Sequence, residues 1–89
     1  MIQRELTLTN RRGLHARAAT KLVKCCQPYD AEVTLHYREQ SAQANNIMSL
    51  LMLAAPCGSV LQVDVEGPQA EEAFAEIEAL FAARFDEDS

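Results

Sequence analysis

Three stretches of the chain alternate apolar and polar residues with a period of two, which is typical of half-buried β-strands. The first runs from Ile2 to Leu8, the second from Glu32 to Tyr37, and the third from Leu61 to Glu66. Residues 41–44 form a shorter candidate strand that follows the second stretch. The pattern therefore predicts a β-sheet of four strands.

Apolar residues recur at helical spacing between the first two strands, at Ala19, Leu22, Val23 and Cys26. A helix is therefore predicted from about Ala16 until Pro28 ends it. A second helix is predicted over the apolar run "IMSLLMLAA" at residues 47–55. Either Asn45 or Asn46 is suited to cap its start.

The last helix is predicted after the turn at Gly67 and Pro68. Six residues form its apolar face: Ala70, Ala73, Phe74, Ile77, Phe81 and Phe85. Glu71 and Glu72 fall in its first turn and Arg84 in its last, which suits the helix dipole. The element order βαββαβα predicts one α+β domain over residues 1–89, with three helices packed on one face of a four-stranded antiparallel sheet.

Composition narrows the class of protein. With 89 residues, of which 48 % are hydrophobic, the chain has material for one modest core. No apolar run approaches the length of a membrane helix, and the charged N-terminus is unlike a signal peptide. We therefore expect a cytoplasmic protein without membrane contact. Cys25, Cys26 and Cys57 lack C-x-x-C spacing, which fits reduced thiols. A metal site of Cys25, Cys26 and His36 is incomplete, so no metal or cofactor is expected.

The formal net charge of −5 argues against a nucleic-acid binder, and the charge is unevenly distributed. Residues 1–24 hold six basic side chains against one carboxylate, whereas residues 66–89 hold eight carboxylates against one arginine. Arg17, Lys21 and Lys24 share one side of the first predicted helix and form a basic stripe. This stripe is either an ordinary solvated face or a docking site for acidic partners.

His15 lies at the start of that helix, between the turn at Gly13 and Arg17. The amides of the first helical turn, at Ala16, Arg17 and Ala18, have no partner within the helix and attract anions. The arginine fork can hold two phosphate oxygens. These parts suit phosphoryl transfer through a phosphohistidine, with His15 as nucleophile. A capping or surface histidine is the alternative, and it is the commoner case.

The stretch "GLHARAA" at residues 13–19 resembles the "GLHARPA" motif of HPr, the histidine-containing phosphocarrier of the bacterial phosphotransferase system. The segments "YDAEV", "SLLMLAA", "GPQAEEA" and "FDED" are more similar to the nitrogen-related branch of that family, often called NPr. The resemblance covers the whole chain and implies an open-faced β-sandwich. It also implies a monomeric carrier, not itself an enzyme, that takes phosphate from enzyme I on Nδ1 of His15 and gives it to a histidine of an enzyme IIA.

Two positions depart from the family pattern. Ala18 stands where the motif has proline, and Asn46 stands where many relatives have a serine that a regulatory kinase phosphorylates. The first leaves the histidine chemistry intact. The second removes the hydroxyl that serine control requires.

The second predicted helix is apolar on nearly every side. If Leu50 and Leu53 point inward, four further apolar residues are left partly exposed, namely Ile47, Met48, Leu51 and Met52. Such a patch is suited to docking more than one partner, and the family resemblance favours this role. A deeply buried helix is the alternative.

Two other functions compete with the carrier. A small phosphohydrolase of the acylphosphatase kind would need an anion-binding loop and a group that orients water, and the sequence contains neither motif. A regulatory binding module would use His15 only as an interface residue.

Overall fold

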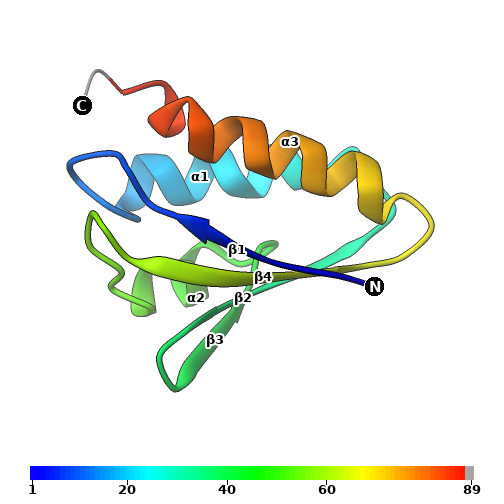
Figure 1. Ribbon diagram of the computed structural model, residues 1–89, viewed down its shortest axis with the longest axis horizontal. Helices are drawn as coiled ribbons and strands as arrows, with labels where there is room; N and C mark the ends of the chain where they lie inside the picture. The colour runs from blue at the N-terminus through cyan, green and yellow to red at the C-terminus, as the bar shows by residue number, and fades with distance from the viewer. Residues whose placement is uncertain (88–89) are drawn as a thin grey trace.

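The computed structural model describes residues 1–87, which form a four-stranded antiparallel sheet covered by helices (Figure 1). The strands are β1 (Ile2–Thr7), β2 (Glu32–Tyr37), β3 (Gln40–Gln43) and β4 (Val60–Glu66), arranged in the order β1-β4-β2-β3. The three alternating stretches and the short candidate strand are therefore confirmed, the last one residue earlier than predicted. The predicted domain and the acidic ending "DEDS" extend into residues 88–89, which lie outside the described residues.

The helices are α1 (Ala16–Cys26), α2 (Ile47–Met52) and α3 (Ala70–Ala82). In Figure 1, α1 and α3 lie side by side across one face of the sheet, and α2 packs against α1 and β3. All three helices contribute to one hydrophobic core with the inward residues of the strands. Its largest fully buried members include Leu22, Leu35, Leu50, Leu61 and Ile77. The predicted open-faced β-sandwich is confirmed.

Two helix ends differ from the prediction. The second helix stops at Met52 rather than Ala55, and Ala54 adopts a left-handed φ of 51° that turns the chain toward Pro56. The last helix stops at Ala82, so Arg84 is not in its last turn. Phe85 is buried as predicted but lies beyond the helix, whereas Phe74 is only half-buried.

The segment after α3 makes an unusual turn. Arg84, Phe85 and Asp86 have φ values of 53°, 54° and 62°, a left-handed run without glycine. Such a conformation costs about 1–2 kcal/mol per residue. Burial of the Phe85 ring against Phe81, with ring centroids 5.0 Å apart, offsets part of this cost. The turn directs the next residue, Glu87, toward the start of α1.

Candidate functional site

His15 is the N-cap of α1. Its backbone is extended, with φ −88° and ψ −178°, and its carbonyl accepts the first helical hydrogen bond from the Ala19 amide at 2.8 Å. The amides of residues 16–18 therefore precede the helical ladder. Within this turn the Arg17 amide donates to Nδ1 of His15 at 3.3 Å. The predicted position of His15 at the helix start is confirmed, with Nδ1 facing the positive end of the helix.

The loop before His15 is held against the segment that follows α2. The Leu14 amide donates to the Ala55 carbonyl at 3.0 Å. Gly13 has a φ of +68°, and a Cβ there would lie 2.5 Å from the same carbonyl oxygen. Both the backbone conformation and the close approach require glycine. Gly13 thus fixes where the histidine loop lies.

A carboxylate from the other end of the chain contacts the ring of His15. Nε2 of His15 is hydrogen-bonded to Oε2 of Glu87, and the two side chains are 15 % and 13 % exposed. Oε1 of Glu87 accepts a hydrogen bond of 3.1 Å from Nδ2 of Asn10, which also donates to the Gly13 carbonyl at 2.8 Å. Asn10 is fully buried. The site is therefore a network of His15, Glu87 and Asn10.

The hydrogen bonds define the tautomer of the neutral His15 ring. Because the Arg17 amide donates to Nδ1, this nitrogen presents a lone pair. The carboxylate of Glu87 can only accept, so the ring proton lies on Nε2. The ring therefore offers an unprotonated nitrogen at the helix start and a proton donor on its opposite edge.

The charge of Glu87 is also set by its surroundings. Burial raises the pKa of this carboxyl, but hydrogen bonds from His15 and Asn10, together with the charge of Arg12, outweigh burial and leave the pKa below its usual range. Glu87 is therefore an anion at neutral pH, and it accepts a charge-assisted hydrogen bond from His15.

The basic stripe is only partly free. Arg17 and Lys24 are exposed, but Nζ of Lys21 donates to the Phe85 carbonyl at 3.0 Å and lies 3.3 Å from a carboxylate oxygen of Asp86. The basic and acidic ends of the chain, which the sequence presents as separate, thus meet beside α1. In Figure 1 the end of the described chain lies beside the start of α1.

The apolar patch on α2 is exposed as predicted. Leu50 and Leu53 are buried, whereas Met48 and Met52 are 67 % and 74 % exposed. Ile47 is 36 % exposed, and Leu51 is half-buried against the core. A deeply buried helix is therefore ruled out, while docking at this patch stays a prediction.

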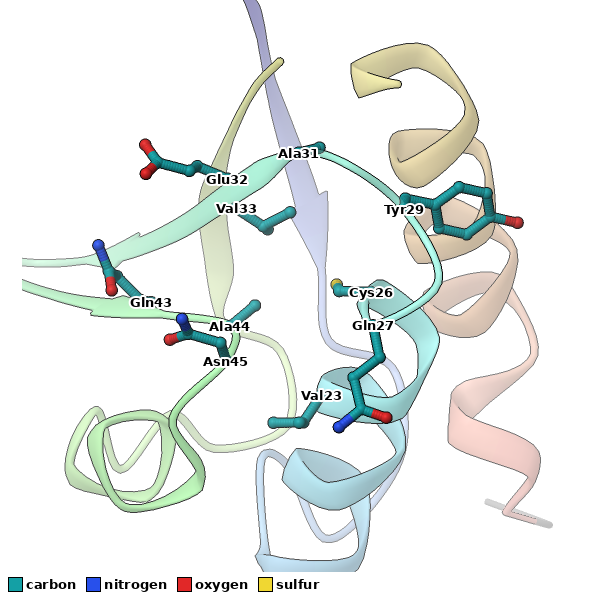
Figure 2. A pocket seen from close by; sticks show the side chains of 10 residues that line it. All are labelled: Val23, Cys26, Gln27, Tyr29, Ala31, Glu32, Val33, Gln43, Ala44 and Asn45. Carbon is teal, nitrogen blue, oxygen red and sulfur yellow. The ribbon is translucent and has the colours of Figure 1, made fainter. Parts of the chain in front are cut away.

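A pocket of about 300 Å³ opens at the far end of α1, roughly 16 Å along the helix from His15. Figure 2 shows its lining, in which Val23 and Cys26 of α1 face Val33 and Ala44. Cys26 is half-buried. No lysine, arginine or histidine lies among the lining residues.

The cysteines are free thiols: Cys57 is exposed and Cys25 is half-buried. The hydrogen bond from Cys26 lowers the pKa of the Cys25 thiol, whereas that bond and burial raise the pKa of Cys26. Among the described residues, no three His, Cys, Asp or Glu side chains are grouped as metal ligands would be. No helix within residues 1–87 is long and apolar enough to cross a bilayer.

The sequence predicts His15 and Arg17 as site residues, but it does not predict that Glu87 and Asn10 lie beside them. Glu87 lies 72 positions from His15, in an acidic tail that has no periodic pattern. Asn10 precedes the turn at Gly13, and its polar side chain gives no sign in the sequence that it is fully buried. The tertiary fold brings Glu87 to the histidine. Asn10 is close to His15 in the chain, but its hydrogen bond to Glu87 depends on the fold, so no local signal identifies this pairing.

Comparison with known proteins agrees with this geometry. Residues 2–83 match a family model described as "PTS HPr component phosphorylation site". The chain is 44 % identical to phosphocarrier protein NPr of Escherichia coli K12 over 98 % of both chains. It is 38 % identical to phosphocarrier protein HPr of Xylella fastidiosa over the full length of both.

Solved structures show the same fold. The crystal structure of HPr-C-His from Thermoanaerobacter tengcongensis superposes with a TM-score of 0.94 over 100 % of both chains, at 26 % identity. HPr from Bacillus anthracis is 31 % identical and superposes with a TM-score of 0.80 over 91 % of this chain and 93 % of that one. The chain belongs to the HPr family of phosphocarrier proteins of the phosphotransferase system, which carry phosphoryl groups and are not enzymes themselves.

Proposed function

We propose that His15 is the phosphoryl acceptor, that it takes the group from phospho-enzyme I on Nδ1, and that it passes the group to a histidine of an enzyme IIA in the cytoplasm. The observation that carries this proposal is the hydrogen bond from the Arg17 amide to Nδ1 at 3.3 Å. It marks Nδ1 as the unprotonated nitrogen and aims it at the helix end where a phosphoryl group would be stabilised.

The chemistry at this site is a nucleophilic displacement. The Arg17 amide releases the lone pair of Nδ1, which then forms the bond to phosphorus, while the bond from phosphorus to the donor breaks and returns its electron pair to the donor atom. The amides of Ala16, Arg17 and Ala18, which precede the first helical hydrogen bond, would donate to the oxygens of the incoming dianion. The exposed guanidinium of Arg17 supplies two donors in one plane for its oxygens.

We assign the protein to the nitrogen-related branch and expect it to act as a monomer. Relatives named NPr, from Escherichia coli, Klebsiella oxytoca and Shewanella violacea, are 41–44 % identical to this chain. Relatives named HPr, from Xylella fastidiosa and Cupriavidus necator, are 37–38 % identical. The partner surface would combine the basic stripe with the exposed residues of α2. The charged side chains at the rim of this surface would speed the encounter with a partner, and the flexible methionine side chains would adapt their packing to more than one partner.

Incubation with enzyme I and phosphoenolpyruvate tests the assignment. We expect one acid-labile, base-stable phosphate on the wild-type chain and none on His15→Ala. His36→Ala is the matched control, because His36 also pairs with a carboxylate, Asp64, at 2.8 Å but lies on the sheet. This control should be labelled fully. Phosphate that persists in His15→Ala would contradict the proposal.

A further inference from the structure

We propose that Glu87 is a positioning residue for the phosphoryl acceptor: its carboxylate keeps the ring proton of His15 on Nε2 and so leaves Nδ1 unprotonated for the attack on phosphorus. This inference rests on the proposed role of His15. The contact that supports it is the hydrogen bond between Nε2 of His15 and Oε2 of Glu87. Glu87 lies on the opposite edge of the ring from Nδ1, so it does not occupy the place of the phosphoryl group.

Asn10 holds Glu87 in this position. Its Nδ2 donates hydrogen bonds both to Oε1 of Glu87 and to the carbonyl oxygen of Gly13. A carboxylate oxygen and a carbonyl oxygen can only accept hydrogen bonds. The amide of Asn10 therefore has a single orientation. In that orientation Oδ1 of Asn10 is buried and accepts no hydrogen bond from the described chain. A buried unpaired acceptor lowers stability, so the arrangement is explained by what Nδ2 holds in place.

The backbone delivers Glu87 to the ring from an anchored segment. Phe85 is 1 % exposed, and its carbonyl accepts the hydrogen bond from Lys21. The left-handed run over residues 84–86 then turns the chain back toward His15. Glu87 is thus tied to α1 through Lys21 and to the histidine loop through Asn10. Because both the backbone before Glu87 and its carboxylate are held in place, Glu87 can fix the orientation of the His15 ring.

The same contact serves both directions of transfer. When Nδ1 forms the bond to phosphorus, the proton stays on Nε2 and the ring gains a positive charge opposite the anionic Glu87. When the group is passed on, the bond between Nδ1 and phosphorus breaks and its electron pair returns to Nδ1. The ring then leaves as neutral imidazole, which is a far better leaving group than the imidazolate that would form if Nε2 had lost its proton.

The substitution Glu87→Gln provides a sharp test. The amide of Asn10 requires an acceptor, so the oxygen of the new carboxamide should face Asn10 and its NH₂ group should face Nε2 of His15. A donor at Nε2 shifts the ring proton to Nδ1. Ring ¹⁵N NMR of the unphosphorylated protein should therefore show the Nε2–H tautomer in wild type and a raised fraction of the Nδ1–H tautomer in Glu87→Gln.

Transfer kinetics provide the second readout. We expect Glu87→Gln to lower the rate of phosphoryl transfer from enzyme I by about ten-fold, the scale of losing a hydrogen bond to a charged group. The KM for enzyme I should stay nearly unchanged, because Glu87 acts on the ring rather than on docking. Glu87→Ala, which removes the acceptor without adding a donor, should lower the rate less. Glu78→Gln removes an exposed carboxylate of α3 and should behave as wild type in both measurements.

The outcomes separate this inference from the proposed function. An Nδ1–H tautomer in wild type, or a wild-type ¹⁵N spectrum and transfer rate in Glu87→Gln, would overturn the positioning role. A wild-type chain that takes no phosphate would overturn the acceptor role of His15, while the ¹⁵N spectra would still show whether Glu87 sets the tautomer. The melting temperature of each variant confirms that it is folded.

Discussion

Nζ of Lys21 donates a hydrogen bond to the carbonyl of Phe85 at 3.0 Å, and this contact joins the middle of α1 to the segment that carries Glu87. Lys21 therefore has a structural role in addition to any role in docking. Lys24, one turn further along the same stripe, is exposed. The two lysines should respond differently to the same change of charge.

The charge reversal Lys24→Glu should slow association with enzyme I, and more strongly at low salt, because rim charges act mainly on encounter. Lys21→Glu should do the same and also lower the melting temperature, since it breaks the contacts with Phe85 and Asp86. Stopped-flow association at two ionic strengths measures the first effect. Arg4→Glu on the exposed face of β1 is the control, and an equal slowing there would mean that only net charge matters.

Gly13→Ala should lower the free energy of unfolding by more than about 1 kcal/mol, because the residue has a positive φ and a Cβ would clash with the Ala55 carbonyl. Gly58→Ala is a matched comparison, since Gly58 has a φ of +93° but open space around it. Denaturant unfolding of both variants separates the clash from the backbone strain. Equal losses would show that the clash is relieved by a small movement.

Met48→Asp should weaken binding to the partner while leaving the melting temperature close to that of wild type, because Met48 is 67 % exposed. Leu50→Asp, two residues away and fully buried, should unfold the domain. Calorimetry and a binding titration distinguish these effects. If Met48→Asp binds as well as wild type, α2 is not part of the docking surface.

Asn46→Ala should destabilise the chain by about 1 kcal/mol, since the Asn46 side chain caps α2 by accepting from the Ser49 amide at 3.1 Å. Asn45→Ala, which removes the neighbouring exposed amide, should have little effect. Because Asn46 has no hydroxyl group, a serine-directed HPr kinase should leave position 46 unlabelled. Kinase-dependent phosphate on Ser49 would show that the regulatory position is misassigned.

Ala18→Pro restores the residue of the family motif and should raise stability by about 0.4–1 kcal/mol. The Ala18 amide precedes the first helical bond, so proline removes no donor from the ladder. Phosphoryl transfer should survive, because the amides of Ala16 and Arg17 remain. A lower melting temperature would mean that the buried site of Ala18 has no room for the ring.

The elements of this fold were predictable where the pattern is local. The alternation in β2 and β4, the cap at Asn46 and the start of α1 at Ala16 depend on neighbouring residues and agree with the structure. The ends of α2 and α3 were misplaced because Ala54 and Phe85 adopt left-handed conformations that their residue types rarely favour. Burial of Phe85 against Phe81 stabilises the turn after α3 despite this local preference.

The candidate site divides in the same way. His15 and Arg17 stand together in the chain, and their proposed role is predicted from their place at a helix start together with the resemblance of the "GLHARAA" motif. The partner at Nε2 depends on a contact between the two ends of the chain, and nothing near Glu87 distinguishes it from the other carboxylates of the acidic region. A pairing of this kind is found only once the fold is known.

The left-handed turn after α3 has a practical consequence for handling the protein. It leaves the last described residue in contact with the ring of His15, whereas Met1 lies at the opposite end of the molecule (Figure 1). An affinity tag fused directly after Ser89 would be separated from Glu87 by only two residues. A tag fused before Met1 would lie far from the histidine, and that arrangement is the suitable one for kinetic work.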